Sequence, residues 1–210
     1  MKIPLPIPRL FVTVKEPGGK IVLDTELPCH SYTWNFYMGL FGQLFGVVKS
    51  ISDGIYFLDL TGVQREDASS MVSIYAALSN ALAAVGGSSV GLVVGKGTAP
   101  WALQNHTLAD QILNGIGAGL LSYGQQAVTA VSTAGADRKV TIIRSFYNNS
   151  PSAAITVYEV AQYVDMYAGG TYRVCMIFRD LLDTPIVVPT GGGELQVKLE
   201  TTLTYPSTIS

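Results

Sequence analysis

The sequence predicts an all-β protein, an antiparallel β-sandwich of jelly-roll type with one or two short helices in its N-terminal half. Short runs rich in β-branched and aromatic residues recur at intervals of roughly 8 to 15 residues, as in sandwiches and barrels. Gly, Asn and Pro separate these runs and mark turns. Strands and helices do not alternate in the way that a parallel α/β sheet requires.

The N-terminus is expected to be an extended arm over residues 1–8. Prolines stand at Pro4, Pro6 and Pro8, and the segment lacks the apolar stretch of a secretion signal. The remaining residues, 9–210, are expected to form a single sandwich domain. Its first element is a hairpin, because the β-rich runs 10–14 and 20–23 flank the turn residues 17–19.

A helix is expected next, over residues 31–49, as an insertion into the sandwich. Large apolar side chains recur there at spacings of three and four residues, which is the pattern of one helix face. Three glycines weaken this helix but allow another backbone to approach closely. The aromatic residues of the pattern are Trp34, Tyr37, Phe41 and Phe45.

Strands are expected through the rest of the chain. Residues 71–84 fit either a helix or a strand, and 119–133 are expected to form one long strand. Residues 139–147 and 154–164 are expected to pair as a hairpin around the Asn-Asn-Ser-Pro turn at 148–151, with Arg179 and Asp180 closing a later strand as a charge pair. The other expected strands are 55–60, 90–94, 172–178, the edge piece 185–188, and 194–204.

Composition limits the possible functions. Charged residues make up 13% of the chain, against about 25% in an ordinary soluble domain. So few charges indicate that part of the surface is covered, most simply by other subunits. The net charge of −2 does not fit a nucleic-acid binder. The uncharged stretch 68–95 is long enough to cross a bilayer, but many Ser and Gly residues dilute it, so no membrane span is expected.

Two local motifs resemble catalytic loops, but neither meets the requirements of the motif that it resembles. The stretch GLVVGKGTAPW over 91–101 has the look of a phosphate-binding loop, but Gly97 follows Lys96 where Ser or Thr is required. Residues 87–91 match G-x-S-x-G around Ser89, but a strand-like run follows instead of a helix. His106 is the only histidine after Ser89, and no acidic residue lies between Ser89 and His106. We therefore expect neither nucleotide binding nor a serine esterase.

Acidic residues and cysteines also give no clear site. Carboxylates are scattered, and Glu159 within an apolar strand is expected to form an ion pair, facing Arg144 or Arg173, rather than to serve a glycosidase. Cys29 and Cys175 are far apart, and reduced buried thiols are expected, although a disulfide between them stays open. His30 beside Cys29 lacks further ligands. No metal or other cofactor is expected.

Three segments resemble structural proteins of tailed phages and related prokaryotic viruses. They are VGKGTAPWALQNHTLADQI (94–112), RSFYNNSPSAAITVYEVAQYV (144–164) and MIFRDLLDTPIVVPTGGGELQVKLETTLTY (176–205). They follow the same order as in that family and cover roughly the second half of the chain. The chain departs from the pattern at Ala161-Gln162, where a glycine-containing step is usual, and at Trp101, where a polar residue is usual. The resemblance implies a β-sandwich virion component of the capsid or the tail.

We therefore expect a non-enzymatic viral structural protein that forms a symmetric homo-oligomer on the virion and contacts other virion proteins. The expected subunit contacts are Pro4, Pro6, Pro8, Trp34, Tyr37, Phe41, Phe45 and Trp101. The alternative is a receptor- or glycan-binding module of a fibre or spike, which would present exposed aromatic residues to a host glycan. Its candidates are Tyr123, Tyr163, Tyr167 and Tyr172. A serine or glycoside hydrolase is the remaining alternative.

Overall fold

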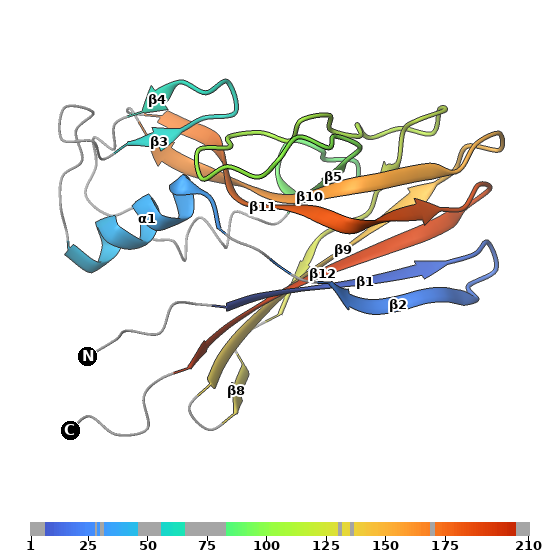
Figure 1. Cartoon of the computed structure of the whole chain (residues 1–210), viewed down its shortest axis with the longest axis horizontal. Helices are drawn as coiled ribbons and strands as arrows, with labels where there is room; N and C mark the ends of the chain where they lie inside the picture. The colour runs from blue at the N-terminus through green and yellow to red at the C-terminus, as the bar shows by residue number, and fades with distance from the viewer. Residues whose placement is uncertain are drawn as a thin grey trace.

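The computed structural model describes residues 7–27, 29, 32–45, 56–65, 83–129, 132–134, 137–168 and 171–204. Among these residues the chain forms two packed antiparallel sheets, which confirms the expected all-β sandwich (Figure 1). Of the predicted arm, residues 1–6 lie outside the described part. Residue 8 does not belong to an extended arm, because the first strand already begins at Ile7 and Pro8 pairs with Thr201.

The larger sheet has the strand order β2-β1-β12-β9-β6. The predicted first hairpin is confirmed, and the turn between its strands uses Gly18 and Gly19 at φ angles of 101° and 89°, where glycine is favoured. The short strands β7 and β8 also pair with β9. The bounds are β1 (Ile7–Lys15), β2 (Ile21–Leu27), β6 (Ser122–Tyr123), β7 (Ala127–Val128), β8 (Ser132–Ala134), β9 (Asp137–Asn148) and β12 (Gly193–Thr204).

The smaller sheet has the order β11-β10-β5, with β5 (Gly91–Gly95), β10 (Ile155–Ala168) and β11 (Thr171–Val188). The predicted helix is present as α1 (Trp34–Phe45), beside one end of this sheet (Figure 1). Residues 46–49 of the prediction lie outside the described part, as does most of 71–84. The predicted strand 55–60 is instead a small hairpin of β3 (Phe57–Leu58) and β4 (Gln64–Arg65).

The predicted hairpin between 139–147 and 154–164 is wrong. β9 pairs with β12 in the larger sheet, whereas β10 pairs with β11 and β5 in the smaller one. The Asn-Asn-Ser-Pro segment therefore carries the chain from one sheet to the other. The buried amide of Asn148 holds this crossing, because its Nδ2 donates to the carbonyls of Ala153 (2.9 Å) and Val188 (3.1 Å).

Two strand boundaries also differ from the prediction. The expected long strand over 119–133 is broken into β6, β7 and β8 in the described residues. Conversely, β11 is one strand from Thr171 to Val188 and includes Pro185, which lies in the stretch 182–185 where the register with β10 shifts; proline is tolerated at such an irregularity on an edge strand. Arg179 and Asp180 do not close a strand as a charge pair; both are buried in the middle of β11.

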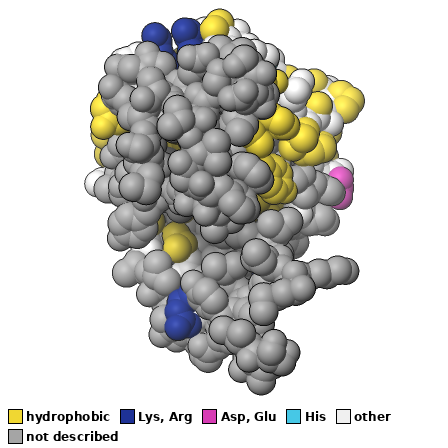
Figure 2. All heavy atoms as spheres, turned by 90° about the vertical axis from the view of Figure 1, so that its left-hand side faces the viewer, with side chains coloured by type: hydrophobic (Ala, Val, Ile, Leu, Met, Phe, Trp, Pro, Cys, Tyr) yellow, Lys and Arg dark blue, Asp and Glu magenta, His cyan; other side chains and the backbone are white. Residues whose placement is uncertain are grey.

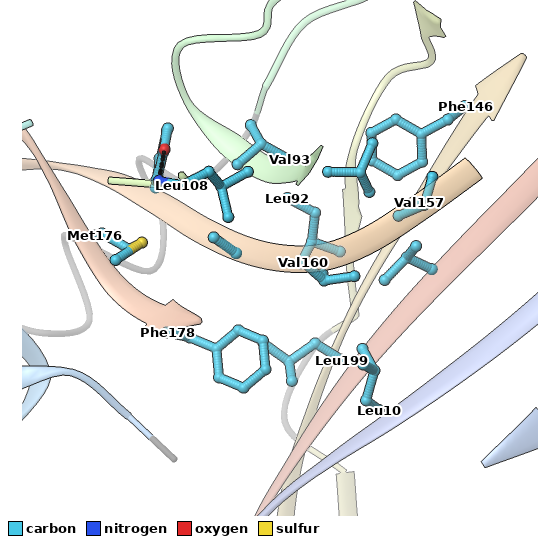
Figure 3. Packing of buried hydrophobic residues seen from close by; sticks show 14 of the residues in the cluster. Leu10, Leu92, Val93, Leu108, Phe146, Val157, Val160, Met176, Phe178 and Leu199 are labelled. Carbon is cyan, nitrogen blue, oxygen red and sulfur yellow. Dashed lines mark hydrogen bonds between the residues drawn. The ribbon is translucent and has the colours of Figure 1, made fainter. Parts of the chain in front are cut away.

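The core lies between the two sheets. Alternate residues of β1, namely Leu10, Val12 and Val14, are buried, as the period of a strand with one buried face requires. Figure 3 shows Leu10 and Leu199 of the larger sheet near Phe178 of the smaller one. Each such buried side chain contributes about 1.5–3 kcal/mol to stability. The sandwich thus gains its stability by hydrophobic burial, and its exposed edges remain available for other roles.

Candidate functional site

The outermost strand of the larger sheet, β2, has one exposed edge. Among the described residues β2 pairs with β1 alone, and it lies below β1 at the lower right of Figure 1. Three consecutive apolar residues of β2 are solvent-exposed: Ile21 (54%), Val22 (47%) and Leu23 (37%). An edge strand with exposed apolar side chains is a ready template for pairing with another strand. We call residues 21–27 the β2 edge.

The β2 edge is exposed because the larger sheet extends beyond the smaller one. β11, the border of the smaller sheet, contacts β1 and β12. Leu27 packs against the core, Thr25 is half-buried, and Leu23 is exposed, although all three lie on the face of β2 that points toward the core side. The inner face of the hairpin therefore loses its cover progressively toward the β1–β2 turn.

Charged side chains line the outer face of the same hairpin. Arg9 and Glu26 form a bidentate ion pair, with Nε–Oε1 and Nη2–Oε2 distances of 2.7 and 2.5 Å. Thr13 donates to Asp24 at 2.8 Å. The pairing with Arg9 lowers the pKa of Glu26 and raises that of Arg9, chiefly through the hydrogen bonds between the two side chains. The outer face is thus solvated, and the apolar surface is restricted to the hairpin end.

The subunit contacts predicted from sequence are only partly described. Trp34 and Tyr37 lie half-buried in the first turns of α1, and Trp34 Nε1 donates to the carbonyl of Tyr56 at 2.9 Å. Trp101 is exposed in the loop after β5, and the backbone N–H of Trp34 binds Leu103 in that loop. Pro8 lies on β1, paired with Thr201 of β12. Pro4 and Pro6, and the side chains of Phe41 and Phe45, lie outside the described part.

The end of the molecule that carries α1 shows further apolar surface. In Figure 2, described hydrophobic side chains gather on the upper part of this face, and the described charged side chains are few and well separated. Sequence reasoning pointed to this end through its aromatic residues. It missed the β2 edge, although the consecutive aliphatic residues 21–23 after a strong turn were a visible signal.

Glu159 and Arg179 form a buried ion pair, and this differs from the predicted pairing with Arg144 or Arg173. The Arg179 Nε and Nη2 atoms lie 3.0 and 2.8 Å from Glu159 Oε2, and both residues are 1% exposed or less. The Glu159 carboxylate also accepts main-chain N–H groups of the loop after β5, at distances of 3.0–3.2 Å. These donors are Gly97, Ala109 and Asp110. Arg179 donates to the same loop, at the carbonyls of Ala99 and Pro100 and the side chain of Asn105.

The Glu159–Arg179 pair explains the glycines that resemble a phosphate-binding loop. A Cβ atom at Gly95 or at Gly97 would lie 2.5 Å from Glu159 Oε1, so only glycine fits at these two positions. The loop is therefore shaped around a carboxylate of its own chain. Since both charged groups are enclosed and hydrogen-bonded, the pair positions the loop and offers no face to a substrate.

Arg144 is a second buried charge, and it lies among main-chain carbonyls. It is 0% exposed. Its guanidinium carbon lies 4.8 Å from the ring centroid of Tyr123 and 5.9 Å from that of Phe146. Burial lowers the pKa of Arg144 to about 10, so the group stays charged at neutral pH. Its guanidinium donates to the carbonyls of Ala84, Gly87, Val90, Leu92 and Gly124.

Arg144 also accounts for the segment with the G-x-S-x-G match. Two of its acceptors, Gly87 and Val90, flank Ser89, which is exposed in the turn before β5. His106 lies instead against Gly62 in the β3–β4 turn, since a Cβ atom at Gly62 would lie 3.0 Å from His106 Nε2. The described contacts place these two residues against different parts of the chain, and they give no support to a serine hydrolase.

The tyrosines proposed for glycan binding divide into two groups. Tyr123 and Tyr163 are buried and hydrogen-bonded inside the chain, so they cannot stack on a sugar, and that prediction is wrong for both. Tyr172 is 63% exposed on β11. The side chain of Tyr167 lies outside the described part.

Both described cysteines are free thiols. Burial raises the pKa of Cys29, and a hydrogen bond with Asp180 adds to this effect. Burial also raises the pKa of Cys175 to about 12. The two groups are thus protonated and unreactive at neutral pH.

The described residues show neither a metal-binding cluster nor a membrane-spanning helix. Within the described ranges, no three His, Cys, Asp or Glu side chains cluster in a way that could hold a metal ion. In the same part of the chain, no helix has both the length and the apolar character that crossing a bilayer requires. Most of the uncharged stretch 68–95 before β5 lies outside the described residues.

Comparisons of the chain with protein-family models, with curated proteins and with solved structures find no match.

Proposed function

We propose that this chain is a non-enzymatic structural subunit that assembles with copies of itself, and that the β2 edge is its contact surface. The observation that carries the proposal is the uncovered end of the β1–β2 hairpin, where Ile21, Val22 and Leu23 are exposed on a strand that pairs on one side only among the described residues. Pairing with a second strand satisfies the free main-chain groups and removes these side chains from water.

A second copy of the same strand is a suitable partner. In an antiparallel pair with a two-fold axis at Leu23, that residue faces its own copy, and Ile21 faces Thr25. Lys20 then faces Glu26 on both sides of the axis, so that two pairs of opposite charges meet. An axis at Asp24 would instead place two carboxylates opposite each other. Charge therefore favours the axis at Leu23 over that at Asp24, and an axis at Leu23 forms a closed, symmetric contact.

A place on a virus particle is the second part of the proposal. It is supported by the resemblance of 94–112, 144–164 and 176–205 to structural proteins of tailed phages, and by the low charge content of 13%, which suits a subunit with much covered surface. The partners would then be further copies of the chain and neighbouring virion proteins.

The oligomeric state of the full chain tests the proposal. Light scattering coupled to size-exclusion chromatography should give a mass that is a whole multiple of 22.4 kDa. Leu23→Lys places a charge at the centre of the expected contact and should shift the protein toward the monomer by at least tenfold in dissociation constant, since like charges then face each other. Val187→Lys is the matched control, because Val187 is also an exposed aliphatic residue (53%) on an edge strand, but in the other sheet.

A wild-type monomer at all accessible concentrations would contradict the proposal. So would an oligomer that Val187→Lys dissociates and Leu23→Lys does not, because the contact would then lie on the smaller sheet. A monomer would make glycan binding through the exposed Tyr172 and Trp101 the next hypothesis to test.

A further inference from the structure

Four loops without a charged residue meet at one end of the sandwich, which we call the uncharged end. These loops are 84–90, 113–122, 149–153 and 189–193. Hydrogen bonds connect three of them: Asn149 Nδ2 donates to Ser122 Oγ at 2.8 Å, and Gly191 N donates to the carbonyl of Ser150 at 2.9 Å. The turns from β9 to β10 and from β11 to β12 mark this end on the right of Figure 1.

Exposed aliphatic side chains gather on two neighbouring loops of the uncharged end. Ile116 is 73% exposed, Leu113 56% and Val85 73%. The loop of Val85 lies beside the other one, since a Cβ atom at Gly86 would lie 3.4 Å from Asn114 Nδ2. Both neighbours of Ile116 in the sequence are glycines, so no adjacent side chain covers it. These loops therefore present an apolar tip to the surroundings.

The charged groups around this tip are buried, paired or remote. Arg144, which binds carbonyls of the loop 84–90, is 0% exposed. Lys96 and Asp110, which follow and precede these loops in the sequence, form an ion pair at 3.7 Å. The turn between β1 and β2, with Glu16 and Lys20, lies on the far side of this end in Figure 1. The tip thus offers no charge to an ionic partner.

Several polar groups of the loop 113–122 are bonded within the loop. Gly115 N donates to the carbonyl of Leu121, and Leu120 N to that of Gly117, both at 3.1 Å. The hydroxyl of Ser122 donates to the carbonyl of Gly115 at 3.0 Å. Groups that are already hydrogen-bonded leave water at a much lower cost than unpaired ones. The loop is therefore suited to an apolar environment.

A lipid surface fits this tip better than a protein does. Protein contacts are rich in aromatic residues, Met and Arg, whereas residues 115–120 are Gly, Ala, Ile and Leu alone. A stable protein contact also needs a broad surface of about 800 Å² on each side, whereas a fluid bilayer adapts to a narrow tip. We propose that the uncharged end binds the surface of a lipid bilayer by inserting Ile116, Leu113 and Val85. Because the tip offers no charge, binding depends on apolar burial and not on anionic headgroups.

Vesicles of phosphatidylcholine test the proposal, because their headgroups carry no net charge. The full-length protein is mixed with them, and the bound fraction is measured by flotation. We expect the wild type to float with the vesicles equally at low and high salt, and added phosphatidylserine to change the binding little. Ile116→Ser should lower the partition coefficient by about tenfold or more, since it removes an aliphatic side chain from the inserted tip.

Val63→Ser is the matched control, because Val63 is an aliphatic residue, 45% exposed, in the turn between β3 and β4 at the opposite end of Figure 1. This variant should bind vesicles as the wild type does. Failure of the wild type to float, equal loss in both variants, or binding only to vesicles with phosphatidylserine would each overturn the proposal. A lower mass of lipid-free Ile116→Ser in light scattering would also overturn it, because this end would then join copies of the chain.

Discussion

At the scale of single residues, the buried arginine Arg144 shows how a charge can stabilise a sandwich without an acidic partner. Its donors bind five main-chain carbonyls, three in the segment before β5, one in β5 and one between β6 and β7. The arginine itself is 0% exposed, so these carbonyls are the partners that its buried charge requires. Arg144 therefore holds in place the chain segment that leads into β5.

We expect Arg144→Met to lower the free energy of unfolding by about 3 kcal/mol, since the hydrogen bonds from one buried side chain to five main-chain carbonyls are lost at once. Urea denaturation monitored by circular dichroism measures this change. Arg173→Met is the control: Arg173 is exposed on β11, and its loss should change stability by no more than about 0.5 kcal/mol. Equal effects of the two substitutions would show that the carbonyl contacts carry no stability.

Asp59 gives a prediction for the dependence of stability on pH. Burial alone would raise its pKa, but hydrogen bonds from Thr61 and Arg65, and from the backbone N–H groups of Val63 and Thr61, lower it to about 2. The Asp59 carboxylate and Arg65 are 2.7 Å apart. Because the folded pKa lies below that of a free aspartate, the ionised form stabilises the folded state above about pH 4, and this contribution is lost as the pH falls toward 2.

Replacement of Asp59 by Asn should therefore remove about 1–2 kcal/mol of stability at pH 7 and much less at pH 2. Denaturation of both proteins across this pH range measures the difference. A difference between wild type and Asp59→Asn that stays constant with pH would contradict the role of the ionised carboxylate.

How far single residues could be predicted from sequence depended on whether their partners were local. The β-rich run 10–14 was correctly predicted as a strand of the first hairpin, because strand propensity and turn residues are local properties. The partner of Glu159 was predicted as Arg144 or Arg173, and is Arg179. Arg144 lies on β9 and the other two arginines on β11, where Arg179 pairs next to Glu159 at Ala161 and Arg173 pairs further along at Met166. The choice among them depends on strand pairing and register, which short-range spacing does not determine.

At the scale of elements, the Glu159–Arg179 pair connects β10 and β11 to the loop over 96–110. The pair is enclosed, so its energy depends on both partners being present. We expect Glu159→Gln to destabilise the protein by about 3–5 kcal/mol, because it leaves the Arg179 charge buried without a counter-charge. Amide hydrogen exchange should also become faster at Gly97, Ala109 and Asp110, whose N–H groups bind the carboxylate.

The double variant Glu159→Leu/Arg179→Met distinguishes the contribution of the ion pair to stability from that of the packing around it. It removes both charges, and we expect it to be more stable than Glu159→Gln while the loop amides remain fast in exchange. If the double variant is the less stable of the two, the ion pair itself makes a net contribution beyond the avoidance of an unpaired charge.

The connections between elements were harder to predict than the elements. The residues of β9, β10 and β12 alternate clearly, and the predictions placed these strands within a few residues of their bounds. The Asn-Asn-Ser-Pro segment, however, has the composition of a hairpin turn and instead connects two sheets. Turn residues indicate that the chain changes direction, but tertiary packing decides which strand it joins. Pro185 similarly indicated an edge strand, but it did not indicate that the same strand, β11, begins before this proline and continues past it.

At the scale of the whole molecule, the two sheets differ in width, and this difference determines which surface is available for assembly. The larger sheet places β2 beyond the border of β11, so the sandwich covers its own core but not the hairpin end. The low charge content indicated a covered surface from composition alone, but not its location. The proposed location, the β2 edge, follows from strand order, which depends on contacts far apart in the sequence.

The symmetry of the proposed contact makes a last prediction possible. With the two-fold axis at Leu23, a cysteine at position 23 faces its own copy, with Cβ atoms about 4.5–5.5 Å apart. In a background where Cys29 and Cys175 are replaced by Ala, Leu23→Cys should form a covalent dimer rapidly with a short bismaleimide, and Tyr172→Cys, exposed on the other sheet, should not. The reaction is followed by non-reducing gel electrophoresis at concentrations where light scattering shows the oligomer. Preferential crosslinking of Val22→Cys would move the axis by one residue, whereas crosslinking of Tyr172→Cys alone would place the contact on the smaller sheet and refute assembly through β2.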